Sequence, residues 1–299
     1  MRTRGVALLA AAVAAGVLAG CGERPGTEPP GAPSAATVDL ITQAGGYPER
    51  RHRIDVAEVE LTRRCMSAAG FRWDGAAEAW NPEAAEGSTI SLDHLREHGY
   101  GLSGGPGGGE PGAAGDEASR RALFGDAADM GELVSPRGAS FRYPRQGCGA
   151  QAYVTLYGDL DTWARISYLP QELNLQLDER ARADPRHAAE VGEWRTCMSA
   201  HGHPYASPED AVDELRDKFR TDHRSPAQRK AEEIDIAVQD ALCDREVGKT
   251  TTALEIRREL ARRLPADDLA EMSRLSALFG LAEERARTQM PSSSAPPAE

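Results

Sequence analysis

The spacing of apolar residues predicts a mainly helical chain. From Glu49 to Ala69, apolar side chains recur close to every 3.6 residues, so that they share one face of a helix. Gly70 follows at the position where a left-handed backbone typically ends a helix. The strand-like candidates are short, at Ser140–Tyr143 and Ala152–Tyr157. The pattern therefore favours an all-α helical bundle, or a mostly α fold with one small β-hairpin.

The C-terminal half of the chain carries clear helix starts. Ser207 and Ser225 each stand directly before a proline, and a serine hydroxyl can cap a helix whose first turn accepts proline. The helix after Ser225 should end near Gly248. Two more helices follow, over about 251–264 and 266–288, and their leucine spacing predicts that they pair as an antiparallel hairpin.

Stretches rich in glycine and proline divide the chain. Residues 22–36 have no apolar period, as expected of a flexible tether, and the glycine run within Gly101–Gly115 can hold neither helix nor strand. No Lys-Ser/Thr pair follows that run, so it does not match a phosphate-binding loop. We predict a signal peptide over 1–20, a lipidated N-terminus and tether over 21–38, a first helical module over 39–183 with a disordered insertion at 101–115, a second helical module over 184–288, and a disordered tail over 289–299.

The N-terminus has the pattern of a secretory signal. Two arginines precede an apolar or small-residue run from Gly5 to Gly20, which is shorter than the roughly 20 apolar residues of a transmembrane helix. The run ends in Leu18-Ala19-Gly20-Cys21, which resembles the bacterial lipobox. The resemblance implies cleavage between Gly20 and Cys21 and a diacylglycerol thioether on Cys21, and two acyl chains anchor a protein stably. The alternative is an ordinary secretory signal in which Cys21 is an incidental thiol.

A six-residue repeat is the most specific feature of the remaining chain. Cys65-Met66-Ser67-Ala68-Ala69-Gly70 recurs as Cys197-Met198-Ser199-Ala200-His201-Gly202, and an aromatic residue, Trp73 or Tyr205, follows three residues after each glycine. Each copy stands at the end of a predicted helix, with its glycine at the helix stop. One further cysteine follows each copy at a distance, Cys148 and Cys243.

The four cysteines other than Cys21 are candidates for disulfides. An exported protein can form disulfides, and four cysteines allow three pairings. If the two copies of the repeat are equivalent modules, the symmetric choice is Cys65–Cys148 with Cys197–Cys243. The rival uses are a metal site or thiol redox catalysis, but no C-x-x-C or C-x-x-H clip is present to prepare either one.

The second copy of the repeat belongs to a longer pattern, which is Trp194-x-x-Cys197-Met198-x-x-x-Gly202-x-x-Tyr205 and a later helix with Ala237, Asp240 and Cys243. With the first copy, this pattern resembles a group of uncharacterised secreted proteins and lipoproteins of actinobacteria, over about 49–100 and 140–285. The resemblance implies export and disulfides, and it implies no activity. The first copy departs from the pattern at Thr62, where the second copy has Trp194.

The charge of the chain argues against nucleic acid as a partner. The sequence carries 35 basic and 47 acidic residues, and its net charge of −12 becomes −14 when a signal with two arginines is removed. Nucleic acids and anionic membrane surfaces both need a positive protein face. Aromatic residues make up 5% of the chain, so its tryptophans are expected as core anchors rather than as a sugar-binding groove.

One short motif is typical of an enzyme. His94-Leu95-Arg96-Glu97-His98 matches the H-x-x-E-H arrangement of inverted zinc peptidases, in which two histidines hold zinc and the glutamate activates water. The predicted helix is barely two turns long, and a glycine-rich break follows instead of a second helix with another ligand. Solvated surface side chains are therefore the expected role of His94, Glu97 and His98. His201 and His203 flank a helix-ending glycine, where an imidazolium is favoured by the helix dipole.

These observations predict a lipoprotein anchored to the outer face of the cell membrane through acylated Cys21. It is expected to act as a non-enzymatic envelope or interaction module and to need no cofactor. The one partner that the sequence predicts is the lipid bilayer, through acylated Cys21. A first alternative is a substrate-binding lipoprotein of a transport system, a class that usually needs two α/β lobes. A second alternative is a zinc-dependent hydrolase that uses His94, Glu97 and His98.

Overall fold

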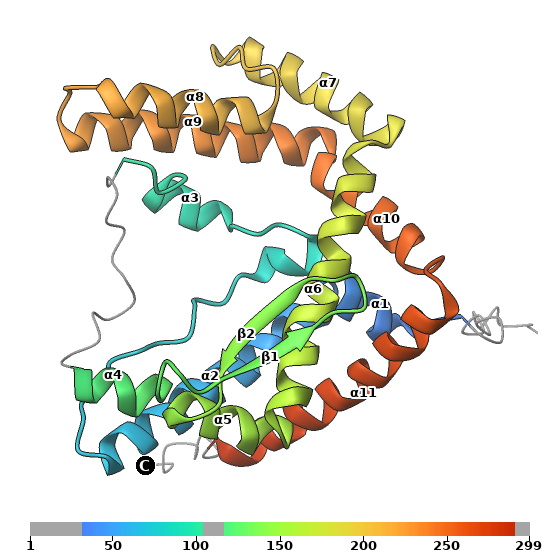
Figure 1. Ribbon diagram of the computed structural model, residues 1–299. Helices are drawn as coiled ribbons and strands as arrows, with labels where there is room; N and C mark the ends of the chain where they lie inside the picture. The colour runs from blue at the N-terminus through green and yellow to red at the C-terminus, as the bar shows by residue number, and fades with distance from the viewer. Residues whose placement is uncertain (1–31, 104–116, 291–299) are drawn as a thin grey trace, which may run out of the picture. The chain divides into compact units, whose positions relative to one another are not determined.

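The structure is a computed structural model, and it describes residues 32–103 and 117–290. Helices dominate these residues, and one two-stranded sheet accompanies them (Figure 1). In chain order the elements are α1 (Ala35–Thr42), α2 (Tyr47–Ala68), the 3₁₀ helix η1 (Pro82–Glu86), α3 (Leu92–His98), α4 (Glu117–Phe124), β1 (Met130–Val134), β2 (Ser140–Pro144), α5 (Gly147–Tyr157), α6 (Leu160–Arg182), α7 (Pro185–Ala200), α8 (Pro208–Thr221), α9 (Pro226–Val247), α10 (Lys249–Ala261) and α11 (Ala266–Gln289).

The prediction of a mainly α, disulfide-stapled fold with one short β-hairpin is confirmed. β1 and β2 pair antiparallel, with Met130 opposite Pro144 and Val134 opposite Ser140. The predicted strand at Ser140–Tyr143 is therefore one of the two strands that the described residues form.

The other predicted strand, Ala152–Tyr157, is wrong because these residues lie in α5. Cys148, Ala152 and Leu156 follow one another at four-residue intervals and are all buried. That spacing places them on one face of a helix, whereas a strand would bury alternate residues. Packing of this face against α2 and α6 outweighs the strand preference of the valine and tyrosines between them.

The larger hydrophobic core is built by helices from both ends of the chain. Its buried residues come mainly from α1, α2, α5, α6, α10 and α11, and the β-hairpin adds Leu133 and Tyr143. Residues of both predicted modules, 39–183 and 184–288, therefore share this core. α10 packs mainly on α6 and α7, and α11 packs mainly on α2 and α5, rather than on each other. The two helices therefore do not form the predicted antiparallel hairpin.

A smaller core lies where α7, α8 and α9 meet (Figure 1). Trp194 and Met198 of α7 are fully buried in it, together with residues of α8 and α9. Tyr100 and Leu102, which follow α3, pack against the same cluster. A third cluster surrounds the end of α2, where Met66 packs with residues of α4 and α5.

The structure differs from the prediction at two segment boundaries. The predicted tether extends to residue 38, but Ser34 caps α1 and residues 35–38 are helical, since Val38 packs into the larger core. The start of the predicted insertion is also held in place, because Glu233 of α9 accepts hydrogen bonds from the backbone N–H groups of Leu102 at 2.5 Å and Ser103 at 2.8 Å. The signal peptide, Cys21, the rest of the insertion and residues 291–299 lie outside the described residues.

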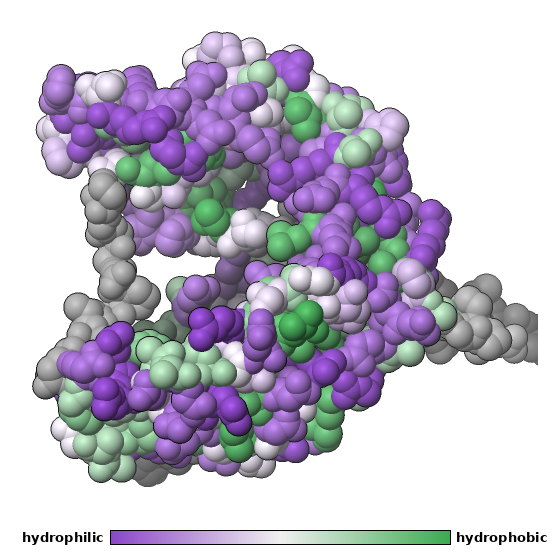
Figure 2. All heavy atoms as spheres, in the orientation of Figure 1, coloured by the Kyte–Doolittle hydropathy of each residue, from purple (hydrophilic) through white to green (hydrophobic). Residues whose placement is uncertain are grey.

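Polar residues dominate one face of the described part of the chain (Figure 2). Figure 2 shows one face on which hydrophilic residues predominate, with apolar residues scattered among them. Within residues 32–103 and 117–290, no helix has the length and apolar character needed to cross a membrane.

Candidate functional site

Both predicted disulfides are present in the structure. Cys65 is bonded to Cys148 with 5.5 Å between the two Cα atoms, and Cys197 is bonded to Cys243 with 5.8 Å. In each pair the later cysteine is almost inaccessible, with Cys148 3% and Cys243 0% exposed. The symmetric pairing, in which each repeat copy is joined to its own later helix, is therefore confirmed.

The two copies of the repeat end their helices with the same hydrogen bonds. In each copy the glycine has a positive φ and donates its N–H to the serine carbonyl, while the next residue donates to the methionine carbonyl. The donor–acceptor distances are 3.0 Å (Gly70 to Ser67), 2.9 Å (Phe71 to Met66), 3.1 Å (Gly202 to Ser199) and 2.9 Å (His203 to Met198). This pair of bonds defines a Schellman helix end. The repeated sequence thus encodes one structural device, which places a disulfide cysteine beside a buried methionine at a helix end.

The second copy adds a buried polar contact. Trp194, which is fully buried, donates its indole N–H to Asp240 Oδ1 at 2.9 Å, and the Tyr100 hydroxyl donates to Asp240 Oδ2 at 2.8 Å. Burial raises the pKa of the Asp240 carboxyl, and the two hydrogen bonds oppose that rise. Thr62, at the matching position of the first copy, is also buried. The position is therefore buried in both copies, although the residue differs.

The cysteines of the second copy also form the one metal-like cluster found among the described residues. Cys197, His201 and Cys243 each place a ligand atom within 4.8 Å of the others. The two sulfurs are bonded to each other, however, so neither offers the thiolate that a metal requires. His201 Nδ1 lies 2.9 Å from the carbonyl oxygen of Cys197, which is the position of a side chain that caps the end of its own helix.

The H-x-x-E-H motif lies on the surface of α3. His94, Glu97 and His98 are all exposed, and α3 is seven residues long. The two imidazole rings lie 4.6 Å apart between centroids, and Glu97 Oε1 lies 3.5 Å from His98 Nε2. Within the described residues, no further histidine, cysteine or carboxylate completes a group of three ligands with them. The structure thus brings the two histidines together and gives them no third ligand there.

One of the four tryptophans, Trp80, lines a pocket, whereas the others pack in hydrophobic clusters. Trp163 and Trp194 are buried in the two cores, and Trp73 packs beside the first disulfide. Trp80 is 41% exposed and lines a pocket of about 300 Å³, which we call the Arg257 pocket. Its walls are the end of α1, the first turns of α2, residues 78–89 around η1, and one residue each from α6 and α10. This volume is at the lower end of those known to hold small molecules, about 300–1,000 Å³.

On the α2 side of this pocket the charges are matched. Arg51 forms an ion pair with Asp55 at 2.5 Å, and its Nη1 donates to the Tyr157 hydroxyl at 2.6 Å. The Tyr157 hydroxyl in turn donates to Glu58 at 3.0 Å. Burial raises the pKa values of the Asp55 and Glu58 carboxyls, and the charge of Arg51 opposes both rises. This network is complete without a ligand.

Arg257, on the α10 side, has no matching charge. It is 9% exposed, and within the described residues its guanidinium makes a single hydrogen bond, from Nη1 to Asn174 Oδ1 at 3.1 Å. Its Nε is buried without a partner. Burial lowers the pKa of Arg257, and the charge of Asp178, which opposes this shift, is itself paired with Arg182 at 2.7 Å. Arginine nevertheless stays protonated at neutral pH, so the pocket wall contains an uncompensated cation.

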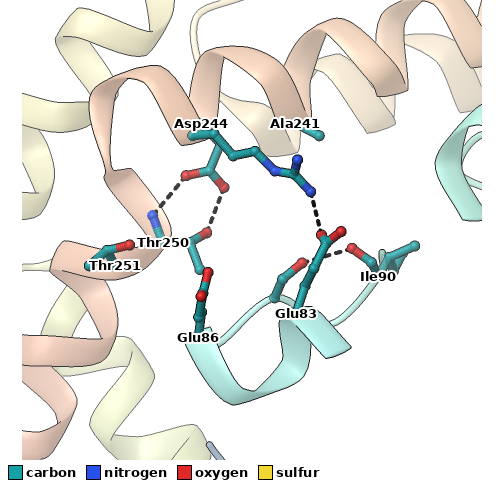
Figure 3. Close-up of a pocket in the computed structure, with 9 residues that line it drawn as sticks. Glu83, Glu86, Ile90, Ala241, Asp244, Thr250 and Thr251 are labelled. Atoms are coloured by element: carbon teal, nitrogen blue, oxygen red, sulfur yellow. Dashed lines mark hydrogen bonds and ion pairs between the residues drawn. The ribbon is translucent and has the colours of Figure 1, made fainter. Parts of the chain in front are cut away.

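A second pocket, of about 320 Å³, lies between η1 and the junction of α9 and α10 (Figure 3). Here Arg245 pairs with Glu83 at 2.6 Å. Asp244 accepts hydrogen bonds from the backbone N–H of Thr250 at 2.8 Å and from its hydroxyl at 2.5 Å. The cation that lines this pocket is neutralised, which makes the Arg257 pocket the better candidate for a ligand.

Sequence patterns did not single out Arg257. It stands in a helix with several other arginines, and its lack of a partner depends on contacts with α6 that no local pattern records. Trp80 is one of four tryptophans in the sequence, and no local pattern sets it apart from the others. No known protein family, curated protein or solved structure matches this chain.

Proposed function

We propose that this chain is a lipoprotein held on the outer face of the cell membrane by acylated Cys21, where it acts as a non-enzymatic envelope or interaction module. The lipobox-like Leu18-Ala19-Gly20-Cys21 after an apolar run supports the anchor. The group of secreted actinobacterial proteins that the repeat resembles supports the same compartment.

The main support for the proposal is the pairing of the cysteines. The chain has five cysteines, and four of them form two disulfides, each in a different hydrophobic cluster. Structural disulfides are typical of proteins exported to oxidising compartments. The remaining cysteine is Cys21, which stands at the one position that the lipobox pattern requires.

The test is metabolic labelling of the full chain with an alkyne analogue of palmitate in a bacterial host. Wild-type protein is expected to take up the label, to partition into the detergent phase, and to have an N-terminal peptide that begins at modified Cys21. Cys21→Ala should lose the label and remain at precursor length. Gly22→Ala changes the next residue and leaves the lipobox intact, so it should behave as the wild type does.

Two results would contradict the proposal. One is label on the Cys21→Ala protein, since acylation would then occur elsewhere. The other is unlabelled wild-type protein released into the medium, which would indicate an ordinary secretory signal.

A further inference from the structure

We propose that the Arg257 pocket binds a small zwitterion, with the anionic group of the ligand against Arg257 and Asn174 and its cationic nitrogen toward Trp80 and Glu78. The proposal concerns the folded domain and does not depend on lipidation. It rests on the geometry of the pocket and on which of its charges are left unpaired.

The anionic end is defined by hydrogen-bond donors that lack acceptors. Arg257 is a buried cation that makes no ion pair within the described residues, and its one acceptor is the Asn174 side-chain oxygen. Because that oxygen faces the guanidinium, the Asn174 amide nitrogen is left as a second donor in the pocket wall. A planar guanidinium with an adjacent amide donor matches a carboxylate, which accepts two parallel hydrogen bonds.

Within the described residues, the lack of an ion pair at Arg257 is not shared by the next residue, Arg258. This neighbour on α10 forms an ion pair with Asp39 at 2.9 Å. Buried polar groups of proteins are nearly always paired, and a buried charge without a partner is unfavourable for folding. The lack of a carboxylate beside Arg257 therefore points to an anion that comes from outside the chain.

The cationic end is defined by Glu78 and Trp80, which both line the pocket. Glu78 makes no ion pair within residues 32–103 and 117–290, and its charge adds to the burial that raises the pKa of nearby Asp55. Trp80 is 41% exposed, and the face of an indole ring attracts cations. The carboxylates and guanidinium groups that line the pocket thus leave one cation and one anion unmatched, which is the charge pattern that complements a zwitterion.

The wall that carries η1 is held firmly enough to keep this shape. The Gly45 N–H donates to the Ala85 carbonyl at 2.8 Å, and the Asn81 side chain donates to the Ser88 carbonyl at 3.1 Å. Gly87, with φ of 94°, lies so close to α10 that an added Cβ would stand 3.3 Å from Arg257 Nη2. These contacts hold the η1 segment in place against α1 and α10.

The experiment is calorimetric titration of the purified full-length protein in mild detergent. The zwitterionic probes are glycine betaine and the standard neutral amino acids. Acetate serves as the anion alone and tetramethylammonium as the cation alone. We expect at least one zwitterion to bind about tenfold or more tightly than either single-charge probe.

Three variants assign the binding to this pocket. Arg257→Gln should weaken zwitterion binding by about tenfold or more, and Glu78→Gln should weaken zwitterion binding while acetate binding stays unchanged. Arg262→Gln is the matched control, since this exposed residue lies just after α10 and outside the pocket. It removes the same charge and should bind as the wild type does.

A thermal melt separates a ligand role from a structural one. Arg257→Met keeps the apolar stem and removes a buried unpaired charge, so its Tm should be equal to or above that of the wild type. Arg258→Met breaks an ion pair and should lower Tm. The proposal is overturned if no zwitterion binds below about 10 mM, if acetate binds as well as the zwitterions, if Arg257→Gln binds normally, or if Arg257→Met lowers Tm as much as Arg258→Met does.

Discussion

Removal of the Cys197–Cys243 disulfide should destabilise the protein by several kcal/mol. The two cysteines are separated by 46 residues in sequence. The loss of loop-closure entropy in the unfolded chain then contributes about 4 kcal/mol of stability at 25 °C. The same relation gives about 4.5 kcal/mol for Cys65–Cys148, whose separation is 83 residues. The two disulfides should therefore contribute nearly equally, although they staple different hydrophobic clusters.

The perturbation is the double variant Cys197→Ala/Cys243→Ala. Alanine is the appropriate replacement, since Cys243 is fully buried and a serine hydroxyl would enter an apolar cluster. Urea unfolding followed by circular dichroism gives the free energy of unfolding, and Tm should fall by about 8–16 °C, at 2–4 °C for each kcal/mol. Wild-type protein in reducing buffer loses the Cys65–Cys148 disulfide as well, so its free energy of unfolding should fall by more than that of this double variant.

Thiol reactivity provides an independent check of this disulfide. In Cys243→Ala, the half-buried Cys197 thiol should react readily with a thiol reagent. In Cys197→Ala, the fully buried Cys243 thiol should react only as fast as the protein opens. A loss of less than about 1 kcal/mol in the double variant would refute the entropy estimate, and equal reactivity of the two thiols would refute the assigned burial.

Three further predictions follow from single side chains. Glu233→Ala should lower the free energy of unfolding by roughly 3 kcal/mol in urea titrations, because two backbone N–H groups lose a charged acceptor; Glu233→Gln keeps one acceptor oxygen and should lose less, and equal losses would contradict this reasoning. The pKa of Asp240 is raised in the folded protein. As pH rises, the Asp240 carboxyl therefore keeps its proton to a higher pH in the folded protein than in the unfolded chain. Its contribution to the free energy of unfolding falls as pH rises from the unfolded pKa to the folded pKa. Asp240→Asn should therefore be less destabilising, relative to wild type, at pH 7 than at about pH 4, and unfolding curves that show the opposite order would contradict the sign. Gly70→Ala and Gly202→Ala should each destabilise by about 1 kcal/mol, because a left-handed backbone disfavours a Cβ. No steric clash adds to this cost, since nothing lies within 4 Å of either added Cβ. Gly125→Ala should destabilise by more, since its Cβ would stand 2.7 Å from the Cβ of Gln146.

The sequence predicts those parts of the fold that local rules determine. Helix ends marked by Ser207, Ser225 and Gly248 all appear at the expected residues. The disulfide pairing follows from the repeat, because equal sequences at equal helix ends place their cysteines in equivalent positions. The strand predicted at Ala152–Tyr157 and the predicted pairing of the last two helices are wrong, since both depend on which distant helices these segments pack against. The last two helices themselves were predicted correctly.

The charge state of the Arg257 pocket could not be predicted in the same way, because it depends on side chains from separate elements. Arg257 and Arg258 are adjacent and chemically identical in the sequence. A helix turns by about 100° for each residue, so the two guanidinium groups meet different neighbours. Arg258 reaches the carboxylate of Asp39 on α1, whereas Arg257 reaches the neutral amide of Asn174 on α6. An apolar side chain would fill this position at a lower free-energy cost if packing were its sole role, and an arginine there is consistent with a position that serves a charged ligand.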